Sequence, residues 1–192
     1  LSPDPVPVRP PNTKWVTDIS YIQTKEGTLY LSMIRDLYDN SIIAYKTAAR
    51  QTVNLVLDTI RLAMKKEKKA AAELQLHSDQ GFQYTSQAYC NLTQEYGITP
   101  SMSRRGNCWD NAPQESFFGH MKDEIGGKIA ACDSFAEAKA VIDDYMDYYN
   151  NDRGQWELLK LTPNEYYEYC ITGIYPLISY NQSEKGNCPQ EK

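Results

Sequence analysis

Apolar and polar residues in the first fifty positions form three short runs that turn-forming residues divide. Aromatic and β-branched residues are concentrated in residues 15–22, 29–36 and 41–49. Gly27 lies between the first two runs, and Asp39-Asn40 lies just before the third. Runs of this length with such breaks are typical of strands joined by tight turns. The pattern predicts an antiparallel meander of three strands.

Helical spacing begins after residue 52. Apolar residues at positions 53, 56, 57, 60 and 64 follow one face of a helix, and Thr52 can cap its start. A short strand is predicted over residues 74–77, a helix over 86–96 and another short strand over 98–101. Because strands that alternate with helices tend to pair in parallel, we expect a mixed sheet with parallel members.

The second half of the chain is predicted to be mainly helical, after a polar loop over residues 102–109. Pro113 suits the first turn of a helix, and Gly126-Gly127 is expected to end that helix. A capping-box sequence at residues 134–137 opens an acidic, tyrosine-rich helix. A last short helix is predicted to start at residues 162–163.

The length of 192 residues fits one domain with a full core. Residues 1–14 contain five prolines and are predicted to be an extended linker that joins a preceding piece of chain. Residues 15–170 are expected to form the folded core. Residues 171–192 are expected to be a partly disordered tail, because their last part lacks core residues.

The composition excludes several classes of protein. The five cysteines form no C-x-x-C pair, which argues against a disulfide framework or a zinc site. No run of about 18 apolar residues is present, so no membrane span is expected. The net charge is −5, and residues 133–168 hold nine acidic and three basic side chains. Because DNA association depends on the local field, this charge neither supports nor excludes a DNA partner.

Three acidic residues stand out as candidates for chemistry. Asp18 lies within the first strand, Asp79 lies just past the end of the strand over 74–77, and Glu115 lies in the first turns of a helix. With only two histidines in the chain, these carboxylates favour a hard divalent cation with oxygen ligands. Each acid alone has a simpler explanation, as a solvated edge-strand acid, a turn former or a surface acid at a helix start.

Four sequence blocks carry a resemblance to a known family. They are W-x-T-D-I-S at 15–20, H-S-D-Q-G-x-Q-Y-T-S at 77–86, S-x-x-G-x-x-x-D-N-A-x-x-E-S-F at 103–117, and Tyr149-Asn150 with Arg153 and Thr162-Pro163. The chain resembles the retroviral-integrase-type catalytic domain of bacterial insertion-sequence transposases, which carry an Asp-Asp-Glu triad, the DDE motif. The role of Arg153 stays open, because Gly154 and Gln155 depart from the family pattern.

The resemblance implies an α/β, RNase H-like fold with a mixed five-stranded sheet flanked by helices. It implies DNA cleavage and strand transfer with Mg²⁺ or Mn²⁺, held as two ions by Asp18, Asp79 and Glu115. The implied partners are the DNA of element ends and of the target, together with further copies of the chain. The implied location is the bacterial cytoplasm, at the nucleoid when DNA is bound.

DNA contacts are expected near these acids. Lys122 lies seven residues after Glu115 on the same helix face, and the resemblance implies a DNA contact there. The alternative is a solvated helix lysine. Arg104 and Arg105 are the best candidates for phosphate binding. Asn107 and Asn111 could add polar contacts, although Asn111 could equally cap its own helix.

Two other functions fit the same fold. One is an RNase H-like nuclease that cuts without joining, and the other is an inactive transposon remnant that binds DNA. An intact set of three acids argues against the remnant. Residues 1–14 cannot form a helix-turn-helix, so sequence-specific DNA binding is not expected from this chain.

Overall fold

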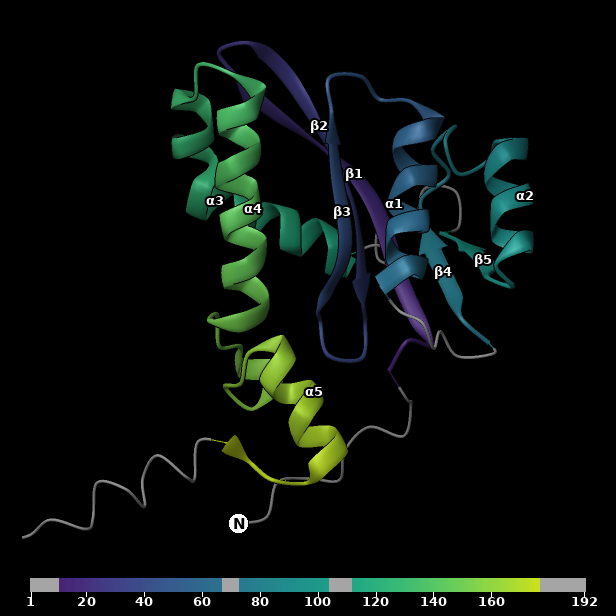
Figure 1. Ribbon diagram of the computed structural model, residues 1–192, viewed down its shortest axis with the longest axis vertical. Helices are drawn as coiled ribbons and strands as arrows, with labels where there is room; N and C mark the ends of the chain where they lie inside the picture. The colour runs from purple at the N-terminus through teal and green to yellow at the C-terminus, as the bar shows by residue number, and fades with distance from the viewer. Residues whose placement is uncertain (1–10, 67–72, 104–111, 177–192) are drawn as a thin grey trace, which may run out of the picture.

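The computed structural model describes residues 11–66, 73–103 and 112–176 (Figure 1). Its strands are β1 (Lys14–Thr24), β2 (Gly27–Asp36), β3 (Ile42–Ala48), β4 (Gln75–Ser78) and β5 (Thr99–Met102). Its helices are α1 (Val53–Lys66), α2 (Gln87–Glu95), α3 (Ala112–Ala131), α4 (Phe135–Asn151) and α5 (Pro163–Thr172), with a 3₁₀ turn η2 (Trp156–Leu158) before α5.

The five strands form one mixed sheet in the order β3-β2-β1-β4-β5. β1, β2 and β3 pair in antiparallel fashion through short turns, which confirms the predicted meander. β4 is parallel to β1 and β5 is parallel to β4, which confirms the predicted parallel members. The long β1 therefore lies at the centre, between the antiparallel half and the parallel half.

Helices cover both faces of this sheet, and each face has its own apolar core (Figure 1). Successive side chains of a strand point to opposite faces. Thus Ile22 of β1 and Met33 of β2 pack under α3 and α4, whereas Trp15 and Ile19 of β1 pack under α1 and α2. This alternation assigns every other residue of β1 to the α3 side of the sheet.

The helix predicted to end at Gly126-Gly127 continues through both glycines, so that prediction was wrong. α3 extends to Ala131, because Ile125 and Ile129 continue its buried stripe and pack in the same core as Met121. A glycine inside a helix costs about 1 kcal/mol relative to alanine. Burial of one isoleucine side chain contributes about 1.5–3 kcal/mol, enough to outweigh that cost.

The two later helices begin with side-chain caps at the predicted places. Ser134 accepts a hydrogen bond from the backbone N–H of Glu137 at the start of α4. Thr162 and Glu165 form a complete capping box at the start of α5. A small apolar cluster that includes Leu161 and Tyr166 lies under α5, beyond the end of α4. In the described part of the chain, none of the helices has the length and apolar character needed to cross a bilayer.

β5 is a short strand at one border of the sheet. It spans four residues and includes Pro100. The amides of Thr99 and Ser103 donate to the carbonyls of Leu74 and Ser78 in the β4 region. Because backbone groups alternate in direction along a strand, the nitrogen of Pro100 points away from β4, toward the border of β5 that no other described strand occupies.

Candidate active site

Asp18 lies near the middle of β1, opposite Met33 of β2. It shares the strand face of Ile22, so its side chain lies on the side of the sheet that α3 and α4 cover. The side chain is partly buried, and its Oδ1 accepts a hydrogen bond from the Ile19 N–H at 2.7 Å. A carboxylate is therefore held on a central strand, on the face that a helix layer covers.

Asp79 directly follows β4, as predicted. β4 runs parallel to β1 with Val16 opposite His77. Asp79 lies two residues past His77 and one residue beyond the end of β4, just as Asp18 lies two residues past Val16. The parallel pairing thus brings together two acids that are far apart in the sequence.

The buried phenol of Tyr84 gives a second indication that these acids are neighbours. Its hydroxyl lies 3.4 Å from Thr17 Oγ1, which ties it to β1. Burial raises the pKa of Tyr84 well above its usual value, and the negative charges of Asp18 and Asp79 raise it further. Both carboxylates therefore lie close enough to this phenol for their charges to act on it.

A tight turn after β4 holds the Asp79 carboxylate. Asp79 Oδ1 accepts a hydrogen bond from the Gly81 N–H at 2.9 Å. A Cβ at Gly81 would lie only 2.9 Å from that same Oδ1 and 3.1 Å from Gln83 Oε1. The glycine in this turn therefore leaves room for the Asp79 carboxylate next to the backbone of the turn, a role that the sequence block alone did not reveal.

Glu115 lies in the first turn of α3, as predicted, and its side chain is exposed. α3 packs on β1, so it covers the face from which Asp18 projects. Among the residues described, no three His, Cys, Asp or Glu side chains converge closely enough to form a complete metal site. The Asp18–Asp79 pair nevertheless provides the carboxylate oxygens that Mg²⁺ or Mn²⁺ prefers, so the donor chemistry fits a hard divalent cation.

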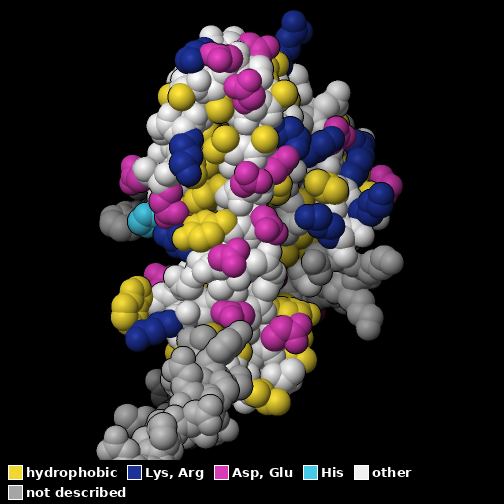
Figure 2. Space-filling model, turned by 60° about the vertical axis from the view of Figure 1, so that its left-hand side comes forward, with side chains coloured by type: hydrophobic (Ala, Val, Ile, Leu, Met, Phe, Trp, Pro, Cys, Tyr) yellow, Lys and Arg dark blue, Asp and Glu magenta, His cyan; other side chains and the backbone are white. Residues whose placement is uncertain are grey.

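The predicted DNA-contact residues are only partly placed. Lys122 is exposed on α3, two helical turns beyond Glu115. Arg104, Arg105, Asn107 and Asn111 lie outside the described residues. Figure 2 shows acidic side chains scattered over the α4 side of the molecule, in agreement with the excess of acid in residues 133–168.

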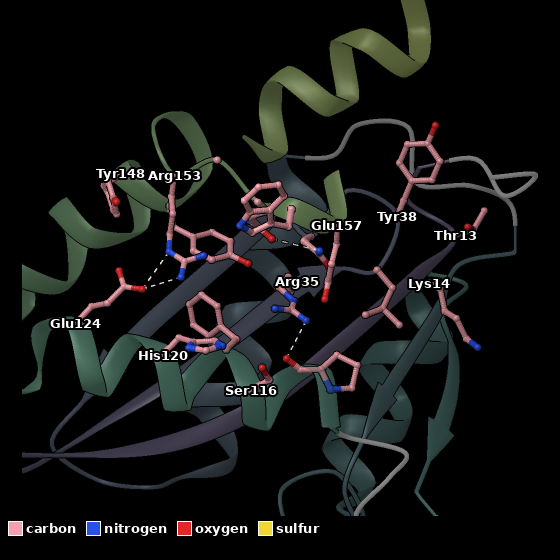
Figure 3. Close-up of a pocket in the computed structure, with 18 residues that line it drawn as sticks. Thr13, Lys14, Arg35, Tyr38, Ser116, His120, Glu124, Tyr148, Arg153 and Glu157 are labelled. Atoms are coloured by element: carbon pink, nitrogen blue, oxygen red, sulfur yellow. Dashed lines mark hydrogen bonds and ion pairs between the residues drawn. The ribbon is translucent and has the colours of Figure 1, made fainter. Parts of the chain in front are cut away.

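A cavity of about 1120 Å³ lies along α3, and sequence reasoning did not predict it. Figure 3 shows the side chains that line it, which come from the start of β1, the end of β2 and the turn after it, α3, the end of α4 and the segment after α4. They include Arg35, Tyr38, His120, Tyr148, Arg153 and Trp156. These polar and aromatic groups come from segments too far apart in the sequence to show a common spacing.

Two arginines of this cavity contact α3. Arg153 donates to Glu124 Oε1 from Nη2 at 2.8 Å and from Nε at 3.1 Å, and its guanidinium lies 5.8 Å from the ring centroid of Tyr149 (Figure 3). It joins the end of α4 to the middle of α3. Arg35, which is only 5% exposed, donates from Nη2 to the carbonyl of Pro113 at 2.9 Å. An arginine inside an apolar strand run was the one sequence signal for it.

Comparison with family models identifies this chain by two matches. Residues 9–108 and residues 115–169 match two models that are both described as integrase core domain. A transposase-like protein of Haemophilus influenzae is 42% identical over 158 residues, which cover 81% of this chain and 71% of that protein. The putative transposase InsK of Escherichia coli element IS150 is 41% identical over 156 residues. The match covers 81% of this chain and 54% of InsK, so the chain spans about half the length of that relative.

Solved structures show the same fold. The HTLV-2 integrase catalytic core domain in complex with magnesium aligns with a TM-score of 0.65 at 14% identity, over 82% of this chain and 97% of that chain. A chain of the simian T-cell lymphotropic virus intasome aligns with a TM-score of 0.67 at 15% identity, over 82% of this chain and 54% of that one. These alignments confirm the expected RNase H-like fold with a mixed five-stranded sheet flanked by helices.

Proposed function

Because the chain belongs to the integrase core domain family, which bacterial insertion-sequence transposases share, we propose that it is the catalytic domain of a DDE transposase. The observation that carries this proposal is the parallel pairing of Val16 with His77, because Asp18 and Asp79 each lie two residues further along the chain and α3, which carries Glu115, packs on β1. The proposed reactions are cleavage of DNA at element ends and joining of a 3′-hydroxyl to a target phosphodiester.

In this proposal Asp18, Asp79 and Glu115 are the metal ligands. Two bound Mg²⁺ or Mn²⁺ ions would supply activation of the attacking oxygen and neutralisation of the leaving oxygen. The chain's own contribution is to hold its carboxylates in place. Asp18 and Asp79 each accept a hydrogen bond from a nearby backbone N–H, which limits the rotation of both side chains.

No histidine is needed as a general base in this mechanism. Both ring nitrogens of His77 lie within hydrogen-bond distance of serine hydroxyls, at 3.0 Å from Ser101 and 3.1 Å from Ser103. These contacts tie β4 to β5 just before Asp79. Such bonds orient the strand end that carries the acid, so His77 has a positioning role.

The proposed partners are DNA and further copies of the same chain. The proposed DNA contacts are Lys122 on α3 and four residues outside the described part of the chain, Arg104, Arg105, Asn107 and Asn111. Phosphate contacts of this kind fix the register of the DNA without reading its sequence. A protein with this activity works where bacterial DNA lies, in the cytoplasm and at the nucleoid.

The first prediction tests the three acids. Asp18→Asn, Asp79→Asn and Glu115→Gln should each reduce metal-dependent joining by more than about 1000-fold, because each removes a ligand charge at the reacting phosphate. The measurement is joining of a labelled, pre-cut DNA end in Mn²⁺. Asp144→Asn, at an exposed position on α4, is the matched control and should join at the wild-type rate.

The outcomes separate the proposal from its rivals. Joining at the wild-type rate by any of the three variants contradicts the assignment of that residue. Cleavage by the wild-type protein without any joined product would indicate a nuclease. Absence of Mn²⁺ uptake in calorimetric titration of the wild-type protein would indicate an inactive remnant.

The second prediction concerns DNA binding. Lys122→Ala should weaken DNA affinity uniformly across sequences and reduce the salt slope by about one unit, because one phosphate contact is lost. Mn²⁺ uptake should stay unchanged. Fluorescence anisotropy at several salt concentrations measures the DNA affinity and its salt slope. An unaltered slope removes Lys122 from the interface. Lys139→Ala, on the surface of α4, is the control for loss of one exposed lysine.

A further inference from the structure

Arg35 is a buried cation on the same face of the sheet as Asp18. β2 pairs with β1 so that Met33 lies opposite Asp18 and Arg35 lies opposite Val16. Met33 and Arg35 are two residues apart, so both point toward α3. Arg35 therefore lies two register positions from the pair of Asp18 and Met33, on the same face of the sheet and between the strand layer and α3.

The guanidinium of Arg35 contacts the turn of α3 that carries Glu115. Its Nη2 donates to the Pro113 carbonyl at 2.9 Å, and its central carbon lies 5.7 Å from the ring centroid of Phe117 (Figure 3). Pro113 and Phe117 lie two residues before and two residues after Glu115. Arg35 thus holds the helix segment on both sides of the acid.

A buried arginine at this position lowers the stability of the fold unless its hydrogen bond and ring contact compensate for the desolvation penalty. Burial lowers the pKa of Arg35, and among the described residues no carboxylate forms an ion pair with it and its Nε has no hydrogen-bond partner. An apolar side chain of similar size would fill the space without the desolvation penalty of a charge. A guanidinium, however, can donate a directed hydrogen bond and stack on an aromatic ring at the same time.

We propose that Arg35 is a positioning residue that fixes the first turn of α3 above β1 and thereby sets Glu115 at its working distance from Asp18 and Asp79. This inference rests on the proposed function for the role of Glu115. Pro113, Ser116 and Phe117 line the cavity beside Arg35, and the hydrogen bond to Pro113 ties this side of the turn to β2.

The test compares Arg35→Met, which keeps the length but loses the donor, with Arg35→Lys, which keeps a charge and a donor. Arg61→Met is the matched control, because Arg61 lies exposed on α1 and pairs only with Asp58 among the described residues. Arg35→Met should increase amide exchange at residues 115–118 by about 10-fold or more, while exchange in the β-sheet stays unchanged. It should also raise the Mn²⁺ concentration for half-maximal joining by about 10-fold.

Arg35→Lys should recover part of both effects, and Arg61→Met should show neither. Wild-type exchange at residues 115–118 together with a wild-type Mn²⁺ requirement in Arg35→Met overturns the proposal. A uniform rise of exchange over the whole fold with an unchanged Mn²⁺ requirement also overturns it, because that pattern indicates a general structural role.

Two further outcomes keep the test decisive. If Arg35→Met does not fold, amide exchange at residues 115–118 and the Mn²⁺ requirement are measured on Arg35→Lys. This variant should show smaller changes in the same direction. If the wild-type protein takes up no Mn²⁺, the proposed function fails, while the exchange at residues 115–118 still decides whether Arg35 holds the first turn of α3.

Discussion

At the scale of single residues, the turn after β4 shows how a glycine can make room for a neighbouring carboxylate and donate a hydrogen bond to it. Gly81 donates its N–H to Asp79 Oδ1 and has no side chain to crowd that oxygen. The backbone angle of Gly81 is not in the left-handed region, so alanine would be tolerated by the main chain. The requirement for glycine is therefore one of space next to the acid.

A third prediction follows for this position. Gly81→Ala should displace the Asp79 carboxylate and lower metal-dependent joining by about 10-fold or more, because an acid moved away from its partner binds the ion less well. Thermal unfolding should change little. The measurement is joining as a function of Mn²⁺ concentration.

Gly127→Ala is the control for this variant. Gly127 lies within α3 with open space around its Cα, so alanine there should stabilise the helix by up to about 1 kcal/mol and leave joining unchanged. A Gly81→Ala protein with the wild-type Mn²⁺ dependence would show that the carboxylate accommodates the methyl group without moving.

At the scale of elements, Arg153 and Glu124 connect α4 to α3. The side chains of Arg153 and Glu124 are 26% and 34% exposed, so the pair is partly shielded from water. A shielded pair with two hydrogen bonds is stronger than an ion pair on an open surface. It fixes the corner after α4 against the helix that carries Glu115.

A double-mutant cycle measures this connection and gives the fourth prediction. Arg153→Met, Glu124→Gln and the double variant should give a coupling free energy of about 1 kcal/mol in urea unfolding. The pair of Lys139 and Asp143, on the surface of α4, should give about 0.3 kcal/mol in the same cycle. Equal coupling in the two pairs would show that partial burial adds nothing here.

The sequence pattern predicted most elements but not the contacts between them. The three-strand meander, the parallel strands and the starts of α3, α4 and α5 were predicted from residue periodicity, turn residues and caps, which are local signals. The end of α3 was predicted wrongly, since burial of Ile129 outweighs the local preference of Gly126-Gly127. Local rules describe a segment alone, and this segment is stabilised by the core beneath it.

The candidate site shows the same limit. Asp18, Asp79 and Glu115 were found because each stands in a recognisable sequence block. Arg35 and the cavity were not, because the bond from Arg35 to Pro113 joins residues 78 positions apart. No spacing rule relates a strand residue to a helix start at that distance along the chain.

At the scale of the whole molecule, Asp36 ties the N-terminal segment to the sheet. Its Oδ2 accepts from the Asn12 N–H at 2.6 Å and its Oδ1 accepts from the Tyr38 N–H at 2.8 Å. Burial is the largest influence on this carboxyl and raises its pKa from 3.8 to about 6, although both hydrogen bonds act in the opposite direction. The folded protein therefore keeps a proton that the unfolded chain has released.

The fifth prediction is that the free energy of unfolding falls as the pH rises from 3.8 to about 6. Between pH 3.8 and about 6 the folded state binds more protons at Asp36, so its contribution falls by about 3 kcal/mol over that window. Urea unfolding at several pH values measures the slope. Asp36→Asn should flatten it, whereas Asp58→Asn, at an exposed carboxylate whose pKa Lys46 lowers, should keep it. An equal slope in Asp36→Asn and wild type would contradict the assignment.

The short edge strand β5 affects how readily these molecules aggregate at high protein concentration. Pro100 has no amide hydrogen to donate on the side of β5 that faces away from β4. An extended peptide that paired with this side would therefore lack one backbone hydrogen bond. The missing donor therefore disfavours edge-to-edge aggregation through β5. Replacing Pro100 with valine would restore the missing donor and open a route to sheet growth between neighbouring molecules.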